Sequence, residues 1–138
     1  MSYDLAVFDP SIAPQDRKVF LSWFEQQTEW KEPHSYNDPN VSSVALQAWF
    51  FEIIREFPPM NGPHKCKQIP VDEWTVTDYG IGTSLIYAAF SWSKTKEAFE
   101  ATVRLAEKHG LGFFNVSSRK SEVWLPSSNG KLVLAHSD

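Results

Sequence analysis

The chain has 138 residues and a formal net charge of −4, and 42% of its residues are hydrophobic. This length and composition are typical of one globular domain with its own core. The lysines and arginines are scattered, whereas binding a phosphate backbone requires clustered basic side chains. No stretch is apolar over the length of a membrane-spanning helix. We therefore expect neither a nucleic acid nor a membrane as a partner.

The single cysteine, Cys66, excludes an intrachain disulfide. Residues 1–10 lack the basic start and the apolar run of a secretory signal. Both features favour the reducing cytoplasm. We expect one cytoplasmic domain that spans residues 1–138.

A strand and a helix are predicted at the start of the chain. Residues 3–8 are mostly apolar and lead into Asp9-Pro10, which is typical of a strand followed by a turn. Pro14 suits the first position of a helix, which should end near Glu29. The apolar residues of this helix recur at helical spacing: Val19, Phe20, Trp23 and Phe24.

A second helix is predicted after a segment rich in proline, asparagine and aspartate. Ser42 or Ser43 can cap it, and Pro58-Pro59 should end it. Its apolar stripe is wide and indicates a helix that lies flat against a sheet: Leu46, Trp49, Phe50, Ile53, Ile54 and Phe57.

The sequence pattern of the second half of the chain predicts five strands and one helix. Gly80 and Gly82 indicate a hairpin between the first two strands, and Asn129-Gly130 indicates another between the last two. Gly110 should end the helix, which Ser93 or Thr95 caps. The predicted strands are residues 74–79, 84–92, 111–116, 122–125 and 131–136.

These elements follow the order strand, two helices, two strands, helix, strand and a closing hairpin. We therefore predict an α+β fold with an antiparallel sheet and helices on one face. Its core would be ferredoxin-like, βαββαβ, with an extra helix and a C-terminal hairpin. The sequence leaves open whether that hairpin extends the sheet or folds over it.

Several common catalytic signatures are absent from the sequence. Gly80-Ile81-Gly82 lies in a predicted hairpin, not between a strand and a helix, so it is no phosphate-binding loop. The patterns G-x-S-x-G, C-x-x-C and H-E-x-x-H do not occur. The sequence predicts no cofactor.

The connection between the first two helices, residues 29–38, is rich in chemically active side chains. It holds two glutamates, a histidine, a tyrosine and an aspartate. Carboxylates and an imidazole together can transfer protons or bind a metal. The alternative is a plain polar connection, in which Asp38 makes a turn ahead of Pro39.

A second group of candidate ligands is His64 and Cys66. They could supply two zinc ligands, and His34 and Asp38 could complete the set if the two loops meet. No second pair stands at finger-like spacing. We interpret residues 60–73 as an exposed loop and predict no metal site.

Asp78 and Tyr79 close a predicted strand just before the glycine turn. We expect Asp78 either at the solvent-exposed edge of the sheet or in contact with a specific partner group. On an open face of the sheet it would line a ligand surface.

Several segments resemble an uncharacterised family of bacterial hypothetical proteins to which no activity is assigned. The segments are residues 3–10, 57–63, 77–82, 86–92 and 112–114. The likeness spans roughly residues 3–135. It implies a bacterial, cytoplasmic, stand-alone domain, and it assigns no catalytic residue.

For the function, we predict a small binding or interaction protein of the accessory or immunity type rather than an enzyme. Its acidic, aromatic surface would mask a basic protein partner, and complementary charge would speed the encounter. Six tryptophans are many for this core, so Trp30 and Trp124 are expected at the surface as anchors. The predicted binding residues are Glu29, Trp30, Glu32, Tyr36, Asn61 and Tyr79, with Asp38 in the same acidic surface.

The alternative is a small-molecule enzyme or sensor with a polar pocket near His34, Asn61 and Asp78. His34 would be a general base or metal ligand, and Asp38 or Asp78 would orient it. Asn61 would donate to a developing negative charge. This hypothesis requires residues 29–38, 60–62 and 78–79 to meet in space. A homodimer that forms through the open face of the sheet is compatible with either function.

Overall fold

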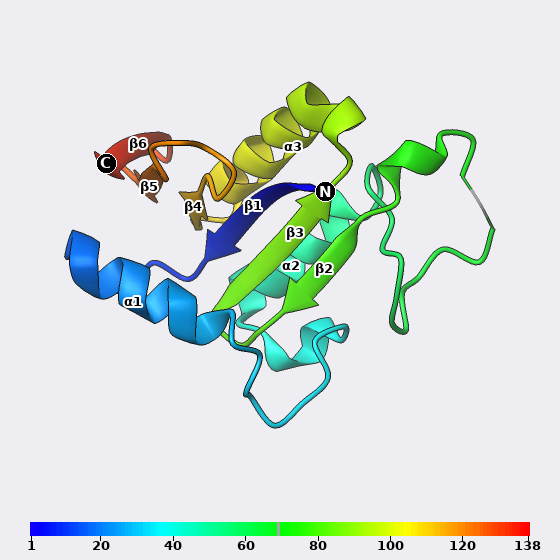
Figure 1. Ribbon diagram of the computed structural model, residues 1–138, viewed down its shortest axis with the longest axis horizontal. Helices are drawn as coiled ribbons and strands as arrows, with labels where there is room; N and C mark the ends of the chain where they lie inside the picture. The colour runs from blue at the N-terminus through cyan, green and yellow to red at the C-terminus, as the bar shows by residue number, and fades with distance from the viewer. Residues whose placement is uncertain (69) are drawn as a thin grey trace.

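The computed structural model describes residues 1–68 and 70–138. A six-stranded antiparallel sheet runs through it, in the order β2-β3-β1-β4-β5-β6 (Figure 1). The strands are β1 (Tyr3–Phe8), β2 (Asp78–Ile81), β3 (Leu85–Phe90), β4 (Gly112–Phe114), β5 (Val123–Pro126) and β6 (Leu132–His136). The α-helices are α1 (Arg17–Gln27), α2 (Val44–Ile53) and α3 (Thr95–Lys108). Short 3-10 helices are η1 (Pro39–Val41), η2 (Glu73–Thr75) and η3 (Trp92–Lys94).

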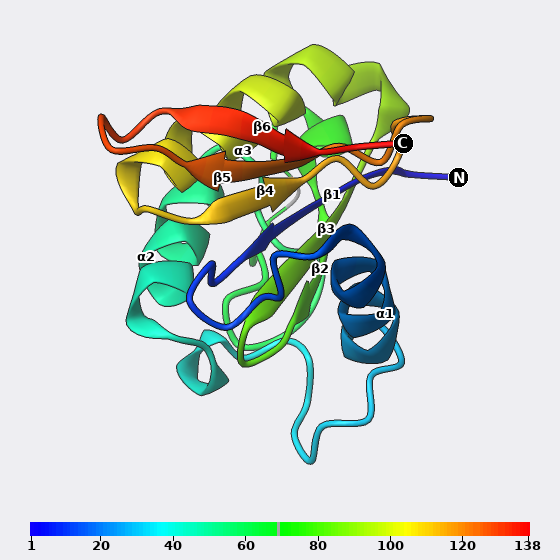
Figure 2. The ribbon, with the colours of Figure 1, turned by 90° about the vertical axis from the view of Figure 1, so that its left-hand side faces the viewer.

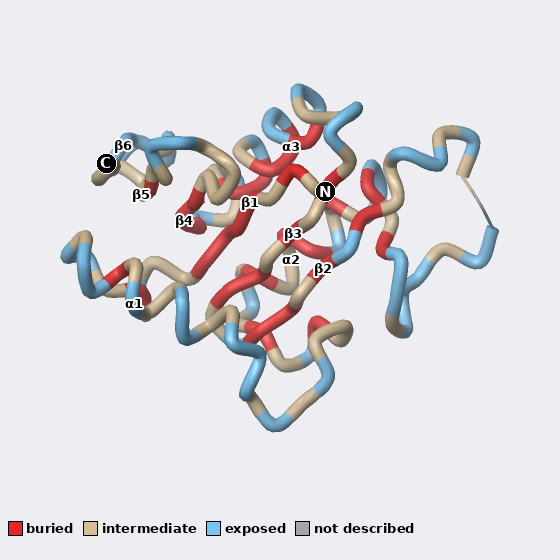
Figure 3. The backbone as a smooth tube through the Cα atoms, viewed as in Figure 1, coloured by how far each residue is buried: buried red, intermediate tan, exposed pale blue. Residues whose placement is uncertain are grey.

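Two hydrophobic cores lie on the two faces of the sheet, because side chains of a strand alternate between its faces. Leu5 and Val7 of β1 point into the larger core, which α2 and α3 cover. Ala6 and Phe8 point into the smaller core, which α1 covers. Figure 2 shows α1 on the side of the sheet away from α2, and Figure 3 shows the buried residues concentrated along the central strands.

The prediction of helices on one face is therefore wrong for α1. The reason is that β1 is apolar at both alternating positions, so each face of the sheet needs a cover. Phe20 of α1 is 1% exposed, and its ring lies 5.2 Å from Phe8 and 5.4 Å from Phe114. The helix begins at Arg17 because the Asp16 side chain caps it, accepting from the Val19 N–H.

The predicted second helix forms, but it is shorter than expected. It ends at Ile53, although Phe57 remains buried. Ser43 occupies the N-cap position without a side-chain capping bond. The Ser42 hydroxyl instead donates to the Gly82 carbonyl oxygen at 2.6 Å, which fastens the start of α2 to the β2–β3 hairpin.

The strand predicted over residues 74–79 is largely wrong. The Asp72 side chain accepts from the Trp74 N–H at 3.1 Å and starts the 3-10 helix η2 in its place. This local side-chain bond competes with strand pairing. The strand β2 starts at Asp78 and includes Gly80, so the hairpin turn falls at residues 82–84.

The closing hairpin is confirmed, and it extends the sheet as β5 and β6. Gly130 holds a positive φ of 84° in its turn. The α+β class is confirmed as well. The six-strand order differs from that of a four-stranded ferredoxin-like sheet, and that finer topology stays a prediction. Within the described ranges, no helix has the length and apolar character needed to cross a membrane.

Candidate functional site

The chain between α1 and η1, residues 28–38, folds over the β2 side of the sheet and forms a cavity of about 350 Å³; we call it the connecting segment. The floor of the cavity is the face of β2 and β3 that lies away from α2, and aromatic rings of the connecting segment form its wall. The residues that line it are Trp30, Tyr36, Asp78, Tyr79, Gly80, Tyr87 and Ala89.

Hydrogen bonds hold the connecting segment against the sheet. The Ile81 N–H donates to the Tyr36 carbonyl oxygen at 2.9 Å, so the segment pairs with the outer edge of β2. The Thr83 N–H donates to the Glu32 carboxylate at 3.1 Å. Within the segment, the Glu32 N–H donates to the Tyr36 hydroxyl at 2.5 Å. The position of the aromatic wall is therefore fixed by the sheet itself.

Trp30 is held in a conformation that L-residues rarely adopt. Its φ is 57°, in the left-handed region, which costs about 1–2 kcal/mol for a residue with a side chain. Its ring meets Tyr36 edge-on at 4.9 Å and Tyr87 edge-on at 6.1 Å, and it lies over Gly80. Trp30 nonetheless remains 39% exposed, so the ring is open to a ligand.

Two carboxylates stand on the cavity face of the sheet. Asp4 and Asp78 both pair with Ala89, one from each side, so the small Ala89 separates them. The Tyr87 hydroxyl donates to Asp4, and the Ser2 hydroxyl donates to the same carboxylate at 2.5 Å. Asp78 is exposed, and within the described residues its carboxylate takes part in no ion pair.

The ionisation of Tyr87 is disfavoured in the cavity floor. Burial raises its pKa, and the hydrogen bond to Asp4 raises it further. The phenol therefore stays neutral and keeps its proton toward Asp4. Within residues 1–68 and 70–138, the Asp78 carboxylate accepts no hydrogen bond and forms no ion pair, whereas Asp4 accepts from Tyr87 and Ser2.

His34 lies in the connecting segment but is paired within it. Its Nε2 is 2.6 Å from Glu32 Oε1 and its Nδ1 is 2.7 Å from the Ser35 carbonyl oxygen. The bond to Glu32 and then the bond to Ser35 raise the His34 pKa. Burial opposes ionisation of Glu32, but the bonds from His34 and Thr83 outweigh it and lower the Glu32 pKa.

The orienting acids proposed for His34 are therefore not its partners. Glu32 takes that place, two residues away in the sequence. Asp38 instead caps η1, accepting from the Asn40 N–H at 2.9 Å. Asp78 lines the cavity, while His34 does not.

The three segments of the predicted pocket meet in space, but two of its residues, His34 and Asn61, do not line the cavity. Gly62 packs so closely on the connecting segment that an added Cβ would lie 2.6 Å from the Asn37 carbonyl oxygen. Asn61 beside it is exposed and does not line the cavity. Glu29 is also outside the cavity lining and forms a surface ion pair with Lys31 at 2.9 Å.

The histidine and cysteine of the 60–73 loop stand apart from these residues. The His64 ring meets the Phe51 ring edge-on at 5.0 Å, and the Cys66 N–H donates to the Pro59 carbonyl oxygen at 3.3 Å. Residues 1–68 and 70–138 contain no group of three or more His, Cys, Asp or Glu that could hold a metal ion.

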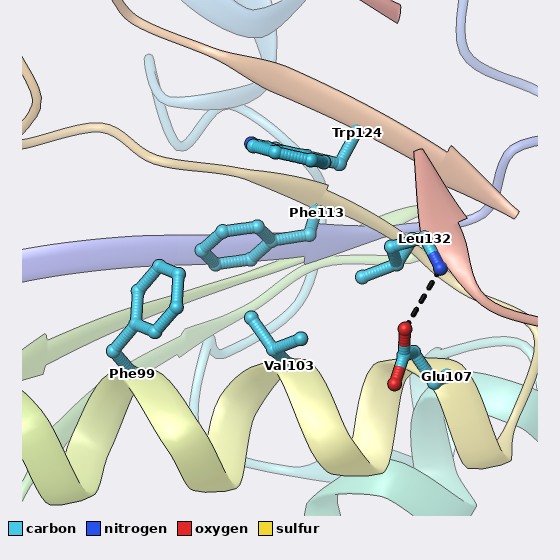
Figure 4. A pocket seen from close by; sticks show the side chains of 6 residues that line it. All are labelled: Phe99, Val103, Glu107, Phe113, Trp124 and Leu132. Atoms are coloured by element: carbon cyan, nitrogen blue, oxygen red, sulfur yellow. Dashed lines mark hydrogen bonds between the residues drawn. The ribbon is translucent and has the colours of Figure 1, made fainter. Parts of the chain in front are cut away.

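A second, apolar cavity of about 190 Å³ lies between α3 and strands β4 to β6 (Figure 4). It contains Trp124, which faces this cleft rather than open solvent. Glu107 is the one charged residue in its lining and accepts from the Leu132 N–H at 2.8 Å. The other lining residues are Phe99, Val103, Phe113 and Leu132.

Sequence reasoning missed three residues of the first cavity: Gly80, Tyr87 and Ala89. They were predicted only as parts of a hairpin and of a strand. The strand register supplies the missing signal, because Gly80 and Tyr87 are direct cross-strand partners and share a face. Comparisons of the chain with protein-family models, curated proteins and solved structures gave no match.

Proposed function

We propose that the chain is a small cytoplasmic binding protein of the accessory or immunity type, whose first cavity receives a cationic side chain from a basic protein partner. One observation carries this proposal. Three aromatic rings, those of Trp30, Tyr36 and Tyr87, share a cavity with the exposed Asp78 carboxylate. We call this arrangement the aromatic cage.

The chemistry of the cage suits a cation. Aromatic rings attract a cation through their negative faces, by about 0.5–2 kcal/mol depending on desolvation. The Asp78 carboxylate adds a charge-assisted hydrogen bond. Arginine fits better than lysine, because its planar guanidinium can stack on a ring while it binds a carboxylate through two N–H groups.

Binding is favoured over the alternative of an enzyme or sensor that uses His34. Both ring nitrogens of His34 already face acceptors in the connecting segment. The raised pKa of Tyr87 keeps its phenol protonated, so it does not serve as a base. A free cationic small molecule would use the same cage, and the titration below registers it too.

The test is a titration with methylguanidinium, followed through the tryptophan indole N–H signals by NMR. N-methylurea, a neutral molecule of similar shape, is the matched ligand control. We expect methylguanidinium to shift the Trp30 signal saturably and N-methylurea to leave it unchanged.

Two variants with the same change in net charge sharpen this test. Asp78→Asn should weaken methylguanidinium binding about 5–10-fold, the loss of one charge-assisted bond. Glu73→Gln, at an exposed carboxylate of η2 outside the cavity, should bind like the wild type. Equal binding of the charged and neutral ligands would refute the proposal.

For the fold, we propose that strands β2, β3, β1 and β4 with α2 and α3 form a ferredoxin-like core. The support is that β3 lies between β1 and β2, and that β1 is antiparallel to both β3 and β4. In this view α1 is the extra helix, and β5 and β6 extend the sheet.

A further inference from the structure

One wall of the second cavity is a row of side chains on α3. Phe99, Val103 and Glu107 are spaced four residues apart, so they lie on the same face of the helix in successive turns. In Figure 4, Phe99 stands at one end of this row and Glu107 at the other, with Val103 between them. Because Val103 is short, the space between its two longer neighbours stays open.

The opposite wall is a row of side chains on the sheet. Phe113 of β4 and Trp124 of β5 are direct cross-strand partners, and Leu132 of β6 reaches the same space. The Phe113 ring meets the Phe99 ring edge-on at 5.6 Å. This wall belongs to the face of the sheet that α2 and α3 cover, whereas the aromatic cage lies on the other face. The second cavity is therefore a separate site.

The size and lining of the second cavity suit one aromatic group. An engineered apolar cavity of about 150 Å³ stays dry and binds benzene. The second cavity, at about 190 Å³, has room for one ring or two small fused rings. Three of its six lining residues are aromatic, and rings pair well edge-on or with an offset. Phe99 is 36% exposed, so the space can be entered from solvent.

The Glu107 carboxylate supplies the polar contact. One of its oxygens, Oε2, accepts from the Leu132 N–H at 2.8 Å. The other, Oε1, is 3.8 Å from the Lys131 ammonium, whose side chain is 74% exposed. A carboxylate can accept about four hydrogen bonds, so Glu107 has capacity for a further donor. Lys131 already offsets its charge, and the site therefore suits a neutral donor better than a second cation.

We propose that the second cavity binds an uncharged aromatic molecule of one or two fused rings that carries an N–H or O–H donor, as indoles and phenols do. The ring lies over Val103, between Phe99 and Trp124. The donor reaches the Oε1 atom of Glu107 and makes a charge-assisted hydrogen bond. This inference goes beyond the proposed function, because it adds a ligand site on the opposite face of the sheet.

The experiment titrates indole into the full chain labelled with 15N-tryptophan, which gives signals from its six tryptophans. Benzofuran is the matched ligand control, because it has the shape of indole with an oxygen in place of the N–H. A Trp124→Phe variant assigns the Trp124 signal. We expect indole to shift this signal saturably and benzofuran to bind about 5–10-fold more weakly, for the loss of one charge-assisted hydrogen bond. Methylguanidinium should leave the Trp124 signal in place.

Two variants locate the ligand. Val103→Phe fills the cavity and should abolish the saturable shift, whereas the same change at the exposed Val19 of α1 should not. Glu107→Gln keeps an oxygen for the Leu132 N–H but turns an amide NH₂ toward the ligand. It should weaken indole about 5–10-fold without weakening benzofuran, and it tests the proposal even where Val103→Phe does not fold.

Three results would overturn the proposal. Equal binding of indole and benzofuran would show that Glu107 accepts no hydrogen bond from the ligand. Indole shifts confined to other tryptophans would place the ligand elsewhere. A Trp124 signal that moves with protein concentration, and not with indole, would show that a second copy of the chain occupies the cavity. None of these results bears on the aromatic cage, which methylguanidinium tests through Trp30.

Discussion

The ring of Trp30 lies directly over Gly80, so closely that a Cβ added to Gly80 would stand 2.7 Å from Trp30 Cη2. Trp30 reaches this place with a φ of 57°, which is unfavourable for a residue with a side chain. The contact with Gly80 and the edge-on contact with Tyr36 hold it there. The wall of the cage is thus formed before any ligand arrives, which reduces the ordering cost of binding.

Replacing Gly80 with alanine should therefore open the cage. The new methyl group would displace the Trp30 ring, and we expect methylguanidinium to bind about 10-fold more weakly, as the loss of a cation–π contact implies. NMR titration measures the affinity, and the indole N–H shift of Trp30 reports the displacement. Ser84→Ala, in the same hairpin but outside the cavity lining, is the control and should bind normally. Unchanged binding by Gly80→Ala would show that Trp30 does not form the site.

Replacing Phe20 tests whether the packing of α1 stabilises the domain. Its buried ring packs between Phe8 and Phe114, so Phe20→Ala should lower the free energy of unfolding by about 3–5 kcal/mol. Phe20→Leu keeps most of the volume and should cost clearly less. Urea unfolding measures both. A loss below about 1 kcal/mol for Phe20→Ala would contradict the second core.

The sequence predicted the elements whose signals are local. Gly110 ends α3 with a positive φ of 66°, and Asn129-Gly130 turns the last hairpin, as their residue types indicate. The strand prediction failed at Trp74, because the Trp74 N–H donates to the Asp72 side chain and this capping bond overrides a pattern that favours a strand. The side of the sheet that α1 covers also escaped prediction, since it depends on long-range packing.

The candidate site was predicted only in part, because only some of its residues have a local signal in the sequence. Asp78 and Tyr36 were found because polar and aromatic residues stand out in a loop or at a strand end. Gly80 and Tyr87 were missed because their importance comes from cross-strand register.

Stability should depend on pH through the pair of His34 and Glu32. The pKa of His34 is raised above its ordinary 6.5, so its contribution is fully present below about pH 6.5 and is lost as the pH rises through the folded value. The pKa of Glu32 is lowered from 4.5, so its contribution is present above about pH 4.5 and is lost as the pH falls through the folded value. The pair is therefore strongest between these limits.

His34→Gln should consequently destabilise the protein more at pH 6 than at pH 9. The difference should stay below about 1 kcal/mol, because the pair is partly accessible to solvent. Urea unfolding at the two pH values measures it, with Glu25→Gln on α1 as a surface control. An equal effect of His34→Gln at both pH values would mean that the ion pair makes no contribution.

Glu107 protects the start of the edge strand β6. Its carboxylate accepts from the Leu132 N–H, so Glu107→Ala should leave that donor without its partner and lower stability by about 1 kcal/mol. The Leu132 amide should also exchange faster with solvent, which hydrogen-exchange NMR detects. Glu100→Ala, on the exposed side of α3, is the matched control. Unchanged exchange at Leu132 would contradict this role.

The proposed function requires that a cationic side chain binds between Trp30 and Asp78. An isotope-filtered NOE experiment on the labelled protein with methylguanidinium tests this directly. We expect NOEs from the methyl protons of the ligand to the rings of Trp30 and Tyr87. NOEs only to Trp74 or Trp92, which are exposed elsewhere on the surface, would contradict it.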